Sequence, residues 1–171
     1  LYGKVNPSGK LPITIPRSTG QIQCMYNHKF TNHWFPYATG NSLPLYEFGY
    51  GLSYTTYKYE NLKLSEATTT PDKSVKVTVD VTNTGKMDGE ETVQLYIRDE
   101  YSSATRPVKE LKDFARIPLK AGETKEVSFT LTPEMLSYYA LWSGKRNFQD
   151  YGGSFFKRYR SAKHYTYSEI K

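Results

Sequence analysis

Apolar and polar residues alternate through the middle of the chain. Residues 75–81 carry valine at every odd position and a polar residue at every even one, and residues 93–97 and 127–131 follow the same period of two. Successive side chains of a β-strand point to opposite faces, so each segment predicts a strand with one apolar face. Weaker patterns over 54–64 and 109–117 predict two further strands.

Turn-forming residues separate these segments at 83–85, 88–89 and 121–123. Half-buried strands at this number and spacing predict antiparallel pairing and a sandwich of two sheets. One helical turn is expected at Thr132–Leu136, where Thr132 stands at the N-cap, Pro133 at the first helical position and an acid follows. The fold class is therefore mainly β.

The two ends of the chain lack this alternation. Residues 1–43 are rich in Pro, Gly, Asn and Ser, and their one apolar run, Leu11–Ile15, is interrupted and followed by prolines. Because proline donates no backbone hydrogen bond, this run predicts a short edge strand or an extended tail. We expect 1–43 to belong to a domain whose larger part lies upstream, so that Leu1 is not a natural start. From residue 143 the chain reads as a poorly specified tail.

Charge and cysteine content exclude several classes of function. Of the net charge of +6, the segment 141–171 carries +5, with seven basic and two acidic residues. A basic tail is not the footprint of a folded nucleic-acid-binding face. With a single cysteine and no Cys/His spacing typical of zinc, we expect no metal and no cofactor. No apolar stretch is long enough to predict a membrane helix.

Few residues suggest chemistry of their own. No Asp or Glu precedes Glu47, and the later acids fall at turns or on the polar faces of strands, which predicts solvated surface charges. Two loop histidines, His28 and His33, match no metal or catalytic spacing. An aromatic cluster could stack on sugars or pack at a domain junction, and packing is the favoured interpretation. Its members are Trp34, Phe35, Tyr37, Tyr46, Phe48, Tyr50, Tyr54 and Tyr57.

Several longer motifs resemble the C-terminal part of glycoside hydrolase family 3, the β-glucosidase and β-xylosidase family. They occur in the family's order and extend over about residues 1–142. These motifs are Asn6–Pro16, Tyr26–Lys29, Pro44–Thr55, Val81–Gly85, Asp88–Glu91, Gln94–Asp99, Arg106–Lys112 and Leu131–Glu134.

The resemblance implies three regions. Residues 1–43 correspond to the terminal segment and linker of the family's α/β sandwich domain, and residues 44–142 to an immunoglobulin-like, fibronectin type III-like β-sandwich. Residues 143–171 depart from the family as an atypical basic tail. Family members close the sandwich with two further strands, so we expect this sandwich to be incomplete at its C-terminus. A shifted reading frame is one hypothesis for the tail.

The resemblance also implies a function without a catalytic residue in this chain. The family's nucleophilic Asp lies in an upstream barrel and its acid/base Glu lies in the α/β domain before Asn6, so neither falls here. The first hypothesis is a C-terminal, non-catalytic portion of an exo-acting β-glycosidase that supports the catalytic domains. Its partners would be those upstream domains and, in the intact enzyme, a β-linked oligosaccharide, with no nucleic acid and no membrane. A periplasmic or secreted parent is expected.

Two alternatives remain open. The chain could be a stand-alone carbohydrate-binding or interaction module that uses the aromatic cluster, or its basic tail could bind nucleic acid. The candidate substrate-binding residues are His28, Lys29 and Trp34, which we expect near the active-site mouth of the parent, on the aglycone side.

Overall fold

The computed structural model describes residues 3–21, 24–29, 43–67, 69–70, 72–99, 105–139 and 146–148. These residues form strands joined by loops and one helical turn, and no helix among them is long and apolar enough to cross a bilayer. The elements are β1 (Tyr57–Leu64), β2 (Val75–Asn83), β3 (Gly89–Ile97), β4 (Glu110–Leu119), β5 (Thr124–Leu131), α1 (Pro133–Leu136), β6 (Ser137–Tyr139) and β7 (Arg146–Phe148).

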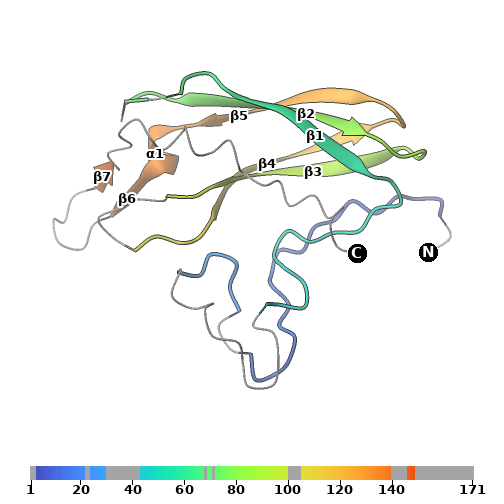
Figure 1. The fold of residues 1–171 in the computed structure, drawn as a ribbon, viewed down its shortest axis with the longest axis horizontal. Helices are drawn as coiled ribbons and strands as arrows, with labels where there is room; N and C mark the ends of the chain where they lie inside the picture. The colour runs from blue at the N-terminus through green and yellow to red at the C-terminus, as the bar shows by residue number, and fades with distance from the viewer. Residues whose placement is uncertain are drawn as a thin grey trace.

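Two antiparallel sheets stack face to face (Figure 1). One has the order β1-β2-β5, and the other is the pair β3-β4. The register between β2 and β5 is unbroken from Val75 opposite Leu131 to Thr82 opposite Thr124. The pairing of β1 with β2 shifts between Glu60 and Lys63. This arrangement confirms the predicted β-sandwich.

The core lies between the sheets and follows the period of two. All four valines of β2 are at most 4% exposed, whereas the residues between them are partly or fully exposed. Burying one such side chain stabilises the fold by about 1.5–3 kcal/mol relative to leaving it in water. The other buried apolar residues are Val93, Ile97, Leu119, Val127, Phe129, Leu131 and Leu136.

A fully buried amide holds one end of the sandwich together. The Asn83 side chain is 0% exposed, and its Oδ1 accepts hydrogen bonds from Thr55 Oγ1 at 2.6 Å and from the Gly85 amide at 3.1 Å. Its Nδ2 donates to the carbonyls of Met87 at 2.9 Å and Leu119 at 3.2 Å. Because all four hydrogen-bonding positions of the amide are used, its burial is compensated. A Cβ on Gly85 would lie 2.0 Å from Thr55 Oγ1, which explains glycine there.

The helical turn forms as predicted, with Thr132 at its N-cap. Thr132 stands at the N-cap in an extended conformation, yet its hydroxyl makes no capping hydrogen bond. The Met135 amide, which such a hydroxyl would bind, donates instead to the Thr132 backbone carbonyl at 3.1 Å. The predicted turn and its N-cap residue are therefore confirmed, and the cap is made without a side-chain hydrogen bond.

The C-terminal tail contains one element that the sequence did not predict. β7 pairs with β6 through three residue pairs, from Ser137 opposite Phe148 to Tyr139 opposite Arg146. A strand of three residues is too short to show a period of two, which is why the pattern gave no signal. Among the described residues, this pair joins neither of the larger sheets. The rest of the tail lies outside the described residues.

Candidate functional site

The N-terminal region packs along the sandwich as an extended arm. We call residues 3–17 the arm and residues 43–54 the return segment; they run side by side below the sheets (Figure 1). The Leu11 amide donates to the Tyr50 carbonyl at 2.7 Å, and the Gly49 amide donates to the Leu11 carbonyl at 2.8 Å. Ile15 bridges Tyr46 in antiparallel fashion. Leu11–Ile15 is thus the extended segment anticipated above, held by isolated backbone contacts.

Asn6 joins three segments that are distant in sequence. Its Oδ1 accepts hydrogen bonds from Ser53 Oγ at 3.0 Å and from the Tyr54 amide at 2.8 Å. Its Nδ2 donates to the Asp88 carbonyl at 3.1 Å, just before β3 begins. One amide side chain therefore connects the arm to the return segment and to the sandwich.

Ser8 places the arm over strands β3 and β4. Thr92 Oγ1 donates to the Ser8 carbonyl at 3.3 Å, and an Arg116 guanidinium nitrogen donates to Ser8 Oγ at 2.6 Å. Arg116 also forms an ion pair with Glu90. These contacts come from side chains, so the arm docks on the sheet without extending its hydrogen-bonded ladder.

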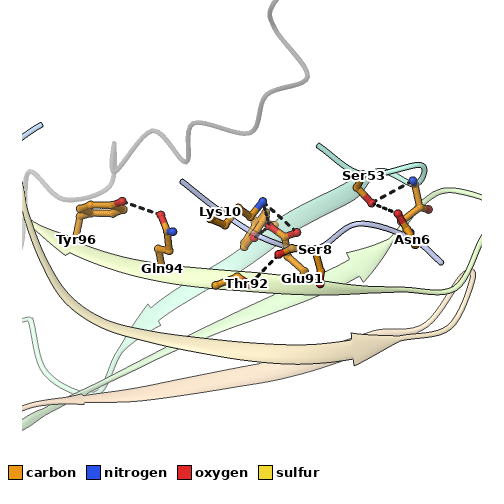
Figure 2. A network of polar contacts seen from close by, with 10 residues as sticks. Asn6, Ser8, Lys10, Ser53, Glu91, Thr92, Gln94 and Tyr96 are labelled. Atoms are coloured by element: carbon orange, nitrogen blue, oxygen red, sulfur yellow. Dashed lines mark hydrogen bonds and ion pairs between the residues drawn. The ribbon is translucent and has the colours of Figure 1, made fainter. Parts of the chain in front are cut away.

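Lys10 reaches a recessed carboxylate at the start of β3 (Figure 2). Lys10 Nζ lies 3.2 Å from Glu91 Oε1 and 3.4 Å from Oε2, and Tyr59 of β1 donates its hydroxyl proton to Oε1 at 2.7 Å. Burial, and secondarily the charge of Glu91, raises the pKa of Tyr59 above its usual range, so the phenol stays a donor. Three segments meet at one carboxylate.

The burial of Glu91 corrects a sequence expectation. It was predicted to be a solvated surface charge, but the residue is only 7% exposed. Glu91 shares the parity of Val93 and Ile97 along β3, so the period of two places it on the inner face. That parity was the available signal. The compensating partner, Lys10, lies 81 positions away in the sequence, so the alternation along β3 could not indicate it.

We call the contact between the N-terminal region and the sandwich the junction. Aromatic rings pack at the end of it that lies away from Asn6. Tyr26 stacks on Phe48 with centroids 4.1 Å apart and meets Tyr96 of β3 edge-on at 6.2 Å. Lys109 Nζ lies 5.4 Å from the centroid of the Tyr96 ring and 3.7 Å from Glu47. These contacts support the packing interpretation for Phe48, whereas Tyr46 and Tyr54 of the same cluster are 42% and 55% exposed. Trp34, Phe35 and Tyr37 lie outside the described residues.

Two of the three candidate substrate-binding residues lie beside the lead-in to β4. The His28 carbonyl accepts a hydrogen bond from the Val108 amide at 3.0 Å, and Lys29 bridges Pro107. The half-buried His28 ring places Nδ1 2.9 Å from the Lys29 carbonyl, while Lys29 is exposed. Trp34 lies outside the described residues, so the structure brings together only His28 and Lys29.

The charged residues of the junction pair with one another across segments. Glu47, Glu90 and Glu91 each face a lysine or arginine. In the part of the chain that the structure describes, no three His, Cys, Asp or Glu residues gather to hold a metal ion. Burial raises the pKa of the single thiol, Cys24. The class defined by these features is a β-sandwich that carries an ordered N-terminal arm.

Comparison with known families identifies both parts. The model of the Glycosyl hydrolase family 3 C-terminal domain matches residues 1–54, and the model of the Fibronectin type III-like domain matches residues 91–150. The chain belongs to glycoside hydrolase family 3 and corresponds to its C-terminal region with the fibronectin type III-like domain.

Individual relatives agree. A putative β-xylosidase of Formosa agariphila is 48% identical over 82% of this chain and 19% of its own length. A periplasmic β-glucosidase of Salmonella typhimurium is 46% identical over 81% of this chain and 20% of its own. The solved β-glucosidase of Erythrobacter marinus superposes with a TM-score of 0.82 at 42% identity, covering 86% of this chain and 20% of that one. The chain thus spans about a fifth of the length of its relatives.

Proposed function

We propose that this chain is the non-catalytic C-terminal part of an exo-acting β-glycosidase and supports the catalytic domains of its parent. The observation that carries the proposal is the match to a family 3 C-terminal domain and a fibronectin type III-like domain over about a fifth of the relatives' length. Those relatives are named β-xylosidases and β-glucosidases, so the parent's substrate would be a β-linked oligosaccharide.

The charges of the junction support a structural role. Retaining glycosidases hold two carboxyl groups about 5–5.5 Å apart, with different proton affinities, on either side of the scissile bond. Each glutamate of the junction is instead paired with a cation, and Glu91 is recessed between Lys10 and Tyr59. Such carboxylates stabilise contacts between segments and are poorly placed to attack a sugar.

Exposed apolar side chains support a docking role for the N-terminal region. Eight of the ten large apolar residues recorded as exposed in the described parts lie between positions 5 and 54, and the sandwich strands contribute Leu62 and Phe114. We propose that upstream domains of the parent cover them, because they are concentrated in the segment that matches the family 3 C-terminal domain. The eight are Val5, Ile13, Met25, Leu43, Leu45, Tyr46, Leu52 and Tyr54.

The isolated chain is expected to release no sugar. Without a paired nucleophile and acid/base, purified chain incubated with aryl β-glucosides and β-xylosides should give the same product as buffer alone, whereas the full-length parent should turn over. A parent cut before Leu1 should also lose stability, seen as a lower Tm. Hydrolysis by the purified chain that disappears in Glu91→Gln would contradict the proposal.

We also propose that His28, Lys29 and Trp34 lie near the active-site mouth of the parent, on the aglycone side. Their place just before the return segment and the exposure of Lys29 support this. In the full-length parent, Lys29→Ala and Trp34→Ala should each raise KM for an aryl glycoside about 5-fold, the effect of one lost contact of about 1 kcal/mol. Lys58→Ala, an exposed lysine on β1, is the control. Unchanged KM in both variants would contradict this placement.

The location of the parent is a further part of the proposal. We propose that it works in the periplasm or outside the cell. The support is the Salmonella typhimurium relative, whose name places it in the periplasm.

A further inference from the structure

The ion pair between Lys10 and Glu91 is more buried than the pair between Lys58 and Glu60 on β1. The side chain of Glu91 is 9% exposed and that of Lys10 is 19% exposed. By contrast, Lys58 and Glu60 on β1 form a shorter ion pair, at 2.7 Å, with side chains 59% and 49% exposed. Exposed pairs contribute little to stability, because water screens them and two long side chains must be ordered. A recessed carboxylate that loses its partner is left as an uncompensated charge.

Lys10 is held in register by its backbone neighbours. Leu11, the next residue, exchanges backbone hydrogen bonds with Gly49 and Tyr50 of the return segment. A Cβ on Gly51 would lie 2.6 Å from the Gly9 carbonyl oxygen and 2.7 Å from Lys10 Cδ. The glycine thus leaves space for the lysine stem, which directs the ammonium group toward Glu91.

The same carboxylate binds a residue that belongs to neither the arm nor β3. Tyr59 of β1 packs against the core and donates its hydroxyl to Glu91 Oε1, the oxygen that also lies nearer to Lys10. Tyr59 therefore fixes the carboxylate from the side of the sandwich while Lys10 holds it from the side of the arm. A change at Tyr59 alters the position of the carboxylate that Lys10 must reach.

We propose that Lys10, Glu91 and Tyr59 form a clasp that locks the arm onto the sandwich, with Glu91 as its receptor and Tyr59 as the residue that positions it. The clasp makes the docking of the arm depend on one carboxylate and on a tyrosine of a different strand. It concerns the fold of this chain and holds whichever reaction the parent catalyses.

Amide hydrogen exchange of the purified full chain tests the clasp, because it separates local opening of the arm from global unfolding. The readout is the exchange rate of a peptide containing the Leu11 and Ile15 amides, which donate to the return segment. Glu91→Gln should speed this exchange about 10-fold, since hydrogen bonds to a charged group are among the stronger ones. Peptides from β2 and β5 should keep their protection.

The variant that distinguishes a clasp from a simple ion pair is Tyr59→Phe. It should speed exchange of the arm about 3-fold or more, as loss of one hydrogen bond to a carboxylate predicts. The matched controls are Glu60→Gln and Lys58→Met, which break the exposed pair on the same strand and should leave the arm unchanged. Unchanged exchange of the arm in Tyr59→Phe would overturn the positioning role.

Lys10→Met keeps the test decisive if Glu91→Gln does not fold. It should speed exchange of the arm about 10-fold with the sandwich still protected, because the half-buried Lys10 stem lies outside the core cluster and methionine replaces most of its length. The double variant Lys10→Met with Glu91→Gln should speed exchange of the arm no more than the larger single change does, since both changes remove the same interaction. Unchanged exchange of the arm in Lys10→Met, or strictly additive effects, would overturn the clasp.

Discussion

Asn83→Ala is expected to lower the free energy of unfolding by about 3–4 kcal/mol, since it leaves several buried polar groups without partners at about 1–3 kcal/mol each, less what water entry recovers. Asn83 is 0% exposed and binds Thr55, Gly85, Met87 and Leu119. Such a loss is a large part of the roughly 5–15 kcal/mol that stabilises a domain. Urea denaturation followed by circular dichroism measures it.

Two further variants sharpen this experiment. Asn83→Asp keeps the acceptor for Thr55 but loses both donors and buries a charge, so it should be at least as destabilising as alanine. Asn27→Ala, an exposed residue of the same type, should change stability by less than about 0.5 kcal/mol. Equal midpoints for Asn83→Ala and Asn27→Ala would show that the buried amide does not hold this end of the sandwich together.

Phe129→Ala is expected to cost about 3–5 kcal/mol, the usual loss for a buried phenylalanine. Phe129 lies on β5 opposite Val77 and is 5% exposed, so its removal leaves a cavity between the sheets. The loss within this range depends on how far the neighbouring core side chains collapse into that space. Thermal and urea unfolding of the purified chain should both report the change.

The chain offers its own control for this prediction. Phe114 on β4 is 63% exposed, and Phe114→Ala should change stability by no more than about 0.5 kcal/mol. Because one phenylalanine is buried and the other is exposed, the comparison separates the effect of burial from that of residue type. A comparable loss in the two variants would mean that the alternation does not mark the inner faces of the sandwich.

The sandwich could be predicted from the sequence because successive side chains of a strand point to opposite faces, and one of those faces is buried. The valines of β2 alternate at the pitch of the pleat, so their inward faces could be read directly from the sequence. The weaker patterns also located β1 and β4, although their bounds shifted to Tyr57–Leu64 and Glu110–Leu119. Residues 60–63 of β1 are all exposed, which blurs the alternation in that strand.

The junction was less predictable, because its contacts join distant residues. Nothing near Lys10 in the sequence indicates that it faces Glu91, and nothing near Asn6 indicates Asp88. The family motifs did single out these residues, and the structure supplies physical reasons for them. The glycine of the Val81–Gly85 motif fits against Thr55, and its asparagine fills the buried amide site. The candidates His28 and Lys29 remain predictions, since their role concerns a substrate of the parent.

The distances in sequence across the junction imply an order of folding. Asn6, Ser8 and Lys10 bind residues of the sandwich that follow them by between 81 and 108 positions. At synthesis rates of about 5–20 residues per second, the arm would leave the ribosome about 4–20 s before those partners. The sandwich must therefore be assembled before the arm can dock, so the final seating of the N-terminal region is a late event during biosynthesis.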